Sequence, residues 1–273
     1  MQQLPGSIYD HPKYYDLVFG ADCAAECRFI IQCAEQFAGR GSKVRMFEPA
    51  CGTGRLMARL AREGCEVSGC DLNAAAVDFC NARLARRGLP ESAFVADMSD
   101  FSIADVPAQV YGRRRPFQWD VAFNTINSFR HLQTARQATA HLRCMGDVIR
   151  KGGLYLLGVH LTPTTSTPSD GEAWSAARGQ LSVSTRMWTN DRDPKARIER
   201  FGIQFLISTP SKMMTIDDEL VLRSYTMAQM NRFLGSVGQI WEVCQTYCFA
   251  YKIDDPLTVS SSTEDVVYVL RRK

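Results

Sequence analysis

The sequence predicts an α/β fold: a doubly wound, Rossmann-like, mostly parallel seven-stranded sheet with an inserted antiparallel β meander. Three observations lead to this prediction. Short apolar segments alternate with amphipathic ones from 43 to 160, a glycine-rich turn follows the first of them, and a two-residue hydrophobic period appears after 180. The 273 residues suffice for one large domain with an insertion, and 45% hydrophobic with 22% charged residues is the balance of a soluble globular protein.

The first half of the chain reads as strands joined by helices. Its strands are predicted at 44–47, 66–70, 93–96, 120–124 and 154–160, and its helices at 54–63, 74–87 and 135–150. Asn73 can cap the second helix, and Gly64 stands where the first would end in a left-handed residue. Near-continuous apolar strands separated by helices indicate a parallel sheet covered on both faces.

The second half follows a different pattern. Residues 162–171 have the composition of a loop or lid, and alternation then predicts strands at 181–189, 197–208 and 212–224. Thr226 can cap a helix through Leu234, and strands at 241–249 and 266–271 complete the sheet. We therefore expect an N-terminal lid and helix (1–42), a Rossmann-like core (43–165), a β insertion (166–225) and a C-terminal helix with two strands (226–273).

Polar residues stand at the end of each of the first four predicted strands. These residues are Glu48, Asp71, Asp97 and Asn124. Ligands of doubly wound sheets bind beyond the carboxyl ends of the strands, so the four side chains are expected to share one rim. Any one of these residues could be ordinary strand-end or cap chemistry, but four in succession favour a binding site.

The glycine-rich turn in VRMFEPACGTGRL raises the question of its ligand. Such turns commonly bind phosphate, yet Glu48 precedes this one and would repel an anion. The turn also has Met57 at the third position of the dinucleotide motif G-x-G-x-x-G, which makes a nicotinamide dehydrogenase a weak alternative. S-adenosyl-L-methionine carries an ammonium, a sulfonium and an adenine amine, all of which suit acidic partners. The turn is therefore predicted to hold an amino-acid tail.

The stretches FEPACGTG, GCDLN, VADM, WDVAFNTINSFRHL and IRKGGLYLLGVHL resemble, in this order, the motifs of the class I S-adenosylmethionine-dependent methyltransferases. The resemblance covers about 44–161 and implies S-adenosyl-L-methionine as cofactor. It implies that Asp71 takes the ribose hydroxyls, Leu72 packs on adenine and Asp97 accepts from the adenine amine. The full set of cofactor contacts implied is Tyr15, Glu48, Ala50, Cys51, Gly52, Gly54, Asp71, Leu72, Asp97, Met98, Asn124 and Ile126.

Two features near this site need separate expectations. Ala50 replaces the first glycine that the family usually has, so we expect a negative φ there. The segment IYDHPKYYDLVFG resembles a lid of small-molecule members of the family, in which Tyr9, Tyr14 and Tyr15 approach cofactor or substrate. The alternative is an amphipathic helix start that packs on the sheet.

The sequence offers few catalytic groups. Candidates are His131, Asn127 and His160, although histidines at such places are often structural. Candidate substrate contacts are Tyr14, Phe129, Arg186 and Arg223. The β insertion is expected to cover the substrate or to form a homodimer contact. Its plan is similar to that of glycine N-methyltransferase-like enzymes and sugar-amine N,N-dimethyltransferases.

The expected function is methyl transfer to a small-molecule nitrogen or oxygen acceptor. A net charge of +3 does not favour nucleic acid as a partner, and the basic triplet at 113–115 reads as a solvated loop. No secretory or membrane-spanning segment is apparent, and ten cysteines without metal-site spacing suggest reduced thiols in a cytoplasmic protein without a bound metal. An RNA or protein methyltransferase and a non-catalytic nucleoside-binding or assembly protein are the alternatives.

Overall fold

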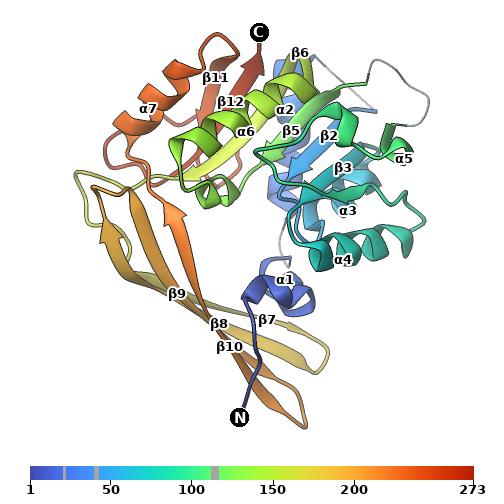
Figure 1. The fold of residues 1–273 in the computed structure, drawn as a ribbon, viewed down its shortest axis with the longest axis vertical. Coiled ribbons are helices and arrows are strands. Elements are labelled where there is room, and N and C mark those ends of the chain that lie inside the picture. Colours follow the sequence, from blue (N-terminus) through green and yellow to red (C-terminus); the bar gives the residue numbers. More distant parts are fainter. Residues whose placement is uncertain (21–22, 40–42, 112–116) are drawn as a thin grey trace.

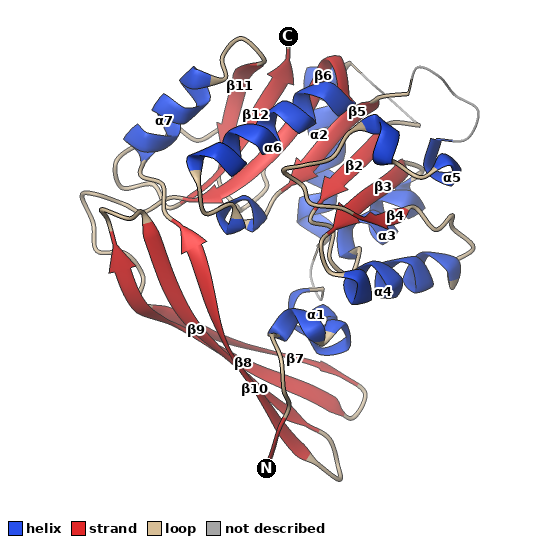
Figure 2. Ribbon diagram, viewed as in Figure 1, coloured by secondary structure: helices blue, strands red, loops and turns tan. Residues whose placement is uncertain are grey.

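The computed structural model describes residues 1–273 apart from 21–22, 40–42 and 112–116, so the basic triplet expected to be a loop lies outside the described residues. Seven strands form one sheet in the order β11-β12-β6-β5-β2-β3-β4 (Figures 1 and 2). Neighbours from β4 to β6 are parallel, whereas β12 is antiparallel to both β6 and β11. The strands are β2 (Arg45–Pro49), β3 (Glu66–Asp71), β4 (Ala93–Val95), β5 (Trp119–Asn124), β6 (Ile149–His160), β11 (Trp241–Tyr247) and β12 (Asp265–Arg272). The predicted fold class is confirmed.

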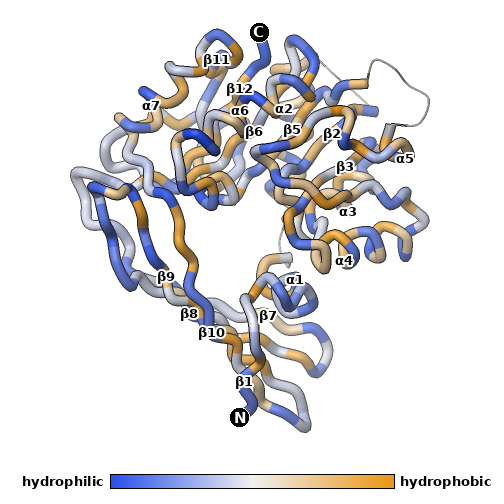
Figure 3. Tube along the Cα trace, in the orientation of Figure 1, coloured by the Kyte–Doolittle hydropathy of each residue, from blue (hydrophilic) through white to orange (hydrophobic). Residues whose placement is uncertain are grey.

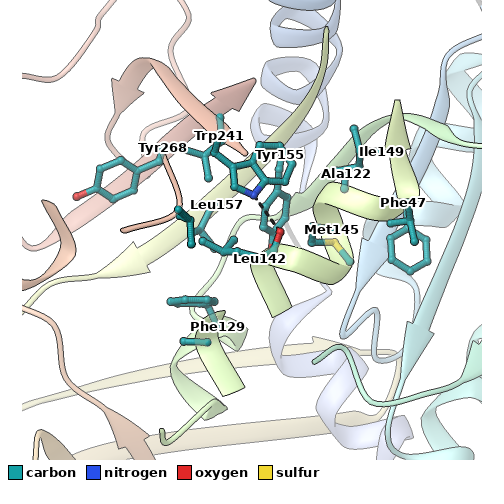
Figure 4. Packing of buried hydrophobic residues seen from close by; sticks show 14 of the residues in the cluster. Phe47, Ala122, Phe129, Leu142, Met145, Ile149, Tyr155, Leu157, Trp241 and Tyr268 are labelled. Carbon is teal, nitrogen blue, oxygen red and sulfur yellow. Dashed lines mark hydrogen bonds between the residues drawn. The ribbon is translucent and has the colours of Figure 1, made fainter. Parts of the chain in front are cut away.

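Helices cover both faces of this sheet because its strand residues alternate between two apolar clusters. On β5, for example, Ala122 packs with one cluster while Val121 and Phe123 pack with the other. The first cluster includes α6 (Ala135–Val148) and α7 (Met227–Ser236), and Figure 4 shows part of it. The opposite face is covered by α2 (Ala24–Ala38), α3 (Arg55–Leu60) and α4 (Ala74–Ala85).

The second sheet is the predicted meander, extended by two strands. Its order is β1-β10-β9-β8-β7, with β1 (Gln2–Gln3), β7 (Gly171–Arg178), β8 (Leu181–Asp193), β9 (Ile198–Ser208) and β10 (Met213–Arg223). Hydrophobic and hydrophilic residues alternate along these strands (Figure 3). The apolar face packs on the N-terminal segment, which forms η1 (Ile8–Asp10) and α1 (Pro12–Phe19). In Figure 1, α1 lies between the meander and the core.

The remaining short helices are connections: η2 (Ala61–Glu63), η3 (Ile103–Asp105), α5 (Ala108–Tyr111) and η4 (Ser128–His131). The predicted helix caps are confirmed. Asn73 accepts from the amides of Ala75 and Ala76, Thr226 forms a capping box, and Gly64 has φ +92°. No strand was predicted where β7 lies. Its sequence GEAWSAAR has one large apolar residue, so it lacks the alternation by which the other meander strands are recognised.

Candidate functional site

The carboxyl ends of β2, β3 and β5 meet at one rim, where the glycine-rich turn connects β2 to α3. Glu48 lies there with 7% of its surface exposed, and Asn124 with 4%. No described hydrogen-bond donor meets Glu48 Oε2 or Asn124 Oδ1, although Asn124 donates to the carbonyl of Pro49 at 2.9 Å. Burial raises the pKa of Glu48 well above its usual range, against the opposing charge of Arg55. Two buried acceptors without donors on one rim suit a ligand that donates hydrogen bonds or carries positive charge.

The turn itself is shaped by three residues in the left-handed region. Ala50, Gly52 and Gly54 have φ of +55°, +52° and +67°. The expectation of a negative φ at Ala50 was therefore wrong, and the β2–α3 turn accepts the cost of an alanine in this conformation. A Cβ on Gly54 would lie 2.2 Å from the sulfur of Cys80, whereas one on Gly52 would meet nothing closer than the Tyr15 ring at 4.0 Å. Gly54 thus allows α3 to pack on α4, and Gly52 leaves open space in front of the turn.

Asp71, at the end of β3, is tied to this turn. Its carboxylate accepts from the amide of Gly52 at 2.7 Å and from the amide of Asn73 at 2.9 Å. Burial raises its pKa, and these backbone hydrogen bonds oppose the rise. Leu72 beside it is 73% exposed and Ile126, after β5, is 47% exposed. Two large apolar side chains open to solvent at the same rim provide apolar surface for a ligand.

The residues after β4 form a local turn. Asp97 accepts from the amide and the hydroxyl of Ser99 at 2.7 and 2.8 Å. The carbonyl of Met98 is bonded to His141 Nδ1 at 2.8 Å. That histidine is fully buried, and desolvation lowers its pKa to about 4. A neutral imidazole therefore braces the loop that carries Asp97 against α6.

The N-terminal segment closes over the turn through its tyrosines. Tyr9 and Tyr15 have ring centroids 5.4 Å apart, and the Tyr9 hydroxyl is bonded to His131 Nε2 at 3.1 Å. The carbonyl of Tyr9 accepts from Asn73 Nδ2 at 3.0 Å. Burial raises the pKa of Tyr15 to about 12 and that of Tyr9 as well, so both remain neutral phenols. This lid therefore joins the rim to the loop after β5.

His131 lies at the surface of this junction. Protein atoms around the ring desolvate it, and together with the charge of Arg130 they lower the pKa of His131. The ring is therefore neutral at pH 7, and either its Nε2 lone pair or its Nε2 proton faces the Tyr9 hydroxyl. Of the three catalytic candidates, this is the one that the structure brings beside the lid.

The other two candidates make structural contacts where β5 and β6 end. Asn127, at φ +55°, accepts from the backbone amide of His160 at 2.6 Å. The His160 ring pairs with Asp265 at 2.9 Å and with Glu264 at 3.5 Å. These contacts hold the loop after β5 against β6 and β12, so both residues have structural partners.

The predicted substrate contacts are dispersed. Phe129, expected in the pocket, is fully buried in the core against Tyr225, and Arg223 is buried where its guanidinium donates to the carbonyl of Gln133 (Figure 4 shows Phe129). Arg186 is exposed on the meander face opposite the one that packs on the lid, because it alternates with the inward-facing Val183. The partly buried Tyr14 belongs to the lid cluster.

Sequence reasoning missed several buried polar residues behind the turn. Glu26 on α2 forms a bidentate pair with Arg55 at 2.5 and 2.9 Å and accepts from Thr125. Asp16 on α1 accepts from Thr53 at 3.2 Å. Acidic residues on amphipathic helices usually face solvent, so nothing in the local pattern separates these two from surface carboxylates.

Other site types find no support in the described part of the chain. All ten cysteines are free thiols there, and no group of three or more His, Cys, Asp or Glu side chains could hold a metal ion. None of the described helices has the length and apolar character that crossing a membrane requires.

Comparison with known proteins identifies this architecture. Residues 47–153 match the family model of a methyltransferase domain, whereas no curated protein matches the chain in sequence. Among solved structures, an S-adenosylmethionine-dependent methyltransferase from Clostridium acetobutylicum superposes with a TM-score of 0.73 at 15% identity, over 96% of this chain and 98% of that one. A sugar N-methyltransferase from Streptoalloteichus superposes with a TM-score of 0.68 at 17% identity, over 100% of this chain and 96% of that one.

A third structure, an S-adenosylmethionine-bound amino pentose methyltransferase from Micromonospora echinaspora, gives a TM-score of 0.67 at 15% identity, over 99% of each chain. These full-length superpositions show that the fold extends through the lid and the meander. The chain therefore contains a methyltransferase domain at 47–153 and has, over its full length, the fold of the S-adenosylmethionine-dependent methyltransferases.

Proposed function

We propose that the protein transfers a methyl group from S-adenosylmethionine to a small-molecule amine, with a hydroxyl acceptor as the variant of the same reaction. The observation that carries this proposal is the closed lid. Tyr9 bonds to His131 and Asn73, and Asp218 of β10 accepts from the Ser7 hydroxyl at 2.5 Å and the Ile8 amide at 3.0 Å. The lid thereby joins the rim, the loop after β5 and the meander, and it covers the open space before Gly52, which favours an acceptor of limited size over RNA or protein.

The rim supports a cofactor orientation. The buried acceptors of Glu48 and Asn124 would receive the methionine end, with the backbone from 50 to 54 passing beside it. Asp71 retains acceptor capacity for ribose hydroxyls, because each of its oxygens has a second lone pair beyond the amide hydrogen bond it accepts. Leu72 and Ile126 would cover the adenine and the methyl-donor side. When bound, the cofactor supplies a methyl group on a positively charged sulfur.

The aromatic lid would stabilise positive charge near the transferred methyl group. Tyr15 reaches the open space before Gly52, and Tyr9 packs on it. Aromatic faces attract cations by about 0.5–2 kcal/mol, depending on desolvation. An amine acceptor must be neutral to attack and sheds a proton after methylation, and neutral His131 is the group beside the lid that can take a proton. Orientation of nucleophile, methyl and sulfur in line supplies the larger share of the rate.

The acceptor class also follows the similar structures. One is a sugar N-methyltransferase and another an amino pentose methyltransferase. We therefore place amino sugars first among the acceptors to be tested, followed by other amines and by phenols.

The experiment uses S-adenosylmethionine labelled in its methyl group and four acceptor pools: amino sugars with their nucleotide-linked forms, amino acids and amines, phenols, and bulk tRNA with denatured protein. Label transfer to a pool of small amines, about 100-fold slower with His131→Asn but unchanged with the distant Arg200→Gln, is the expected result. Transfer confined to tRNA or protein would contradict the proposal, and so would transfer to no pool by a protein that binds the cofactor.

A further inference from the structure

A buried carboxylate on the lid helix links parts of the protein that are otherwise separate. Asp16 of α1 is 1% exposed, although it belongs to a short helix on the edge of the core. A charge at this depth is costly unless it is paired and hydrogen-bonded. Its partners therefore indicate what the carboxylate holds together.

Three elements supply those partners. The Thr53 hydroxyl, in the cofactor turn, donates to Asp16 Oδ1 at 3.2 Å. Arg83 of α4 forms an ion pair with the same oxygen, and Nη2 of Arg178, at the end of β7, lies 3.5 Å from Oδ2. One carboxylate thus joins the lid, the cofactor turn, the core and the meander.

The position of Thr53 gives this junction a functional direction. It stands between Gly52, which faces the open space of the turn, and Gly54, which packs on α4. Tyr15, adjacent to Asp16 on α1, lies over Gly52 and packs on Tyr9. Thr53 and Asp16 thus connect the turn to the lid, and Arg178 connects the same carboxylate to the meander.

We infer that Asp16 is a positioning residue. It couples binding of the cofactor at the glycine-rich turn between β2 and α3 to the placement of the lid and of the β7–β8 hairpin of the meander. This inference rests on the proposed function only in placing the cofactor at the turn. Arg83 holds the carboxylate on the core. Thr53 connects it to the glycine-rich turn, and Arg178 connects it to the meander. Cofactor binding would then order the lid and the meander before the acceptor arrives.

The test measures hydrogen exchange in the full chain with and without S-adenosylhomocysteine, after calorimetry has established its binding to the wild type. Arg178→Gln removes the ion pair from the meander to Asp16 at a side chain that is 66% exposed, so folding is preserved. Thr53→Val removes the hydrogen bond from the turn to Asp16, and Asp16→Asn keeps the shape of the side chain but removes its charge. The matched control is Arg200→Gln, which removes an exposed pair with Glu219 within the meander.

In the wild type, the ligand should slow exchange by about 5-fold or more in 12–19 and in 171–178, the lower end of typical coupling between sites. Arg178→Gln should keep the ligand affinity within about 2-fold and keep the response of 12–19, but lose that of 171–178. Thr53→Val and Asp16→Asn should lose both responses, and Arg200→Gln neither. A merely structural role would lower stability without abolishing these responses.

Two results would overturn the inference alone: a bound wild type that shows no change in 171–178, or an Arg178→Gln variant that responds there as the wild type does. Failure of the wild type to bind S-adenosylhomocysteine would instead overturn the placement of the cofactor, and the link with it. The calorimetric step therefore separates the two failures.

Discussion

Replacement of Glu48 by glutamine separates cofactor binding from folding more cleanly than any other change at the rim. The side chain is 7% exposed, its Oε2 meets no described donor, and burial raises its pKa. Glu48→Gln keeps the volume and one acceptor oxygen but removes the negative charge. We expect it to weaken binding of the cofactor while leaving the ligand-free fold intact.

The magnitude follows from the contact that the charge would make. A hydrogen bond to a charged group contributes about 1.5–3 kcal/mol, and each 1.4 kcal/mol changes an affinity tenfold. S-adenosylhomocysteine, which keeps the ammonium, should therefore bind about 10- to 100-fold more weakly.

In the ligand-free protein, Glu48→Gln should not lower folding stability at neutral pH. A carboxyl whose pKa is raised on folding contributes stability below its unfolded pKa of about 4.3, and that stability is lost as the pH rises through the folded value. Above that value the variant should be at least as stable as the wild type. By the same linkage, cofactor affinity in the wild type should increase with pH as Glu48 loses its proton.

The assay is calorimetric titration with S-adenosylhomocysteine and thermal unfolding of the ligand-free protein, each across pH 5 to about 8.5, the range in which a raised carboxyl titrates. Asp120→Asn is the control. Asp120 is 3% exposed at the amino end of β5, and despite burial the hydrogen bonds from Arg45 and Arg150 hold its pKa below the usual range. This change should lower the unfolding midpoint without affecting affinity. Wild-type affinity in Glu48→Gln, or a loss of stability equal to that of Asp120→Asn, would refute the reasoning.

Three further changes test the rest of the site. Asp71→Ala should weaken binding of S-adenosylhomocysteine by about 1.5–3 kcal/mol, since it removes the proposed ribose acceptors and also the partner of the Gly52 amide; unchanged affinity by calorimetry would show that the nucleoside lies elsewhere. Gly52→Val should abolish binding by filling the space before Tyr15, with a folding cost of about 1–2 kcal/mol for positive φ; binding by a folded variant would exclude the turn. His131→Asn should lower kcat by about 100-fold or more if the ring takes a proton, and wild-type kcat should fall as the pH drops through its lowered pKa; a flat pH profile would leave orientation as the only role of the Tyr9 and His131 pair.

Sequence periodicity was sufficient to predict the core. The apolar strands from 44 to 160 are buried on both faces, so their composition alone marks them, and caps such as Asn73 and Thr226 mark where helices begin. The edge strand β7 escaped prediction because one of its faces is open to solvent and its residues are small. The positive φ of Ala50 escaped because alanine carries no signal for that conformation.

The rim was also accessible from sequence, since strand ends in a doubly wound sheet share one edge, and Glu48, Asp71, Asp97 and Asn124 each occupy a strand end. The sequence did not show which atoms of these residues are available to a ligand. The sequence could not show that Glu48 Oε2 is buried without a donor, or that Asp71 also supports the turn through the Gly52 amide.

What the sequence determined by itself is therefore the order of strands and helices and the chemistry of the rim, because both depend on residues close together in the chain. The tertiary structure alone decided that Tyr9 meets His131, that Phe129 belongs to the core, and that Asp16 reaches Thr53 and Arg178. These contacts join segments tens to well over a hundred positions apart, and their partners are selected by how the lid, the core and the meander pack. No local pattern carries that information.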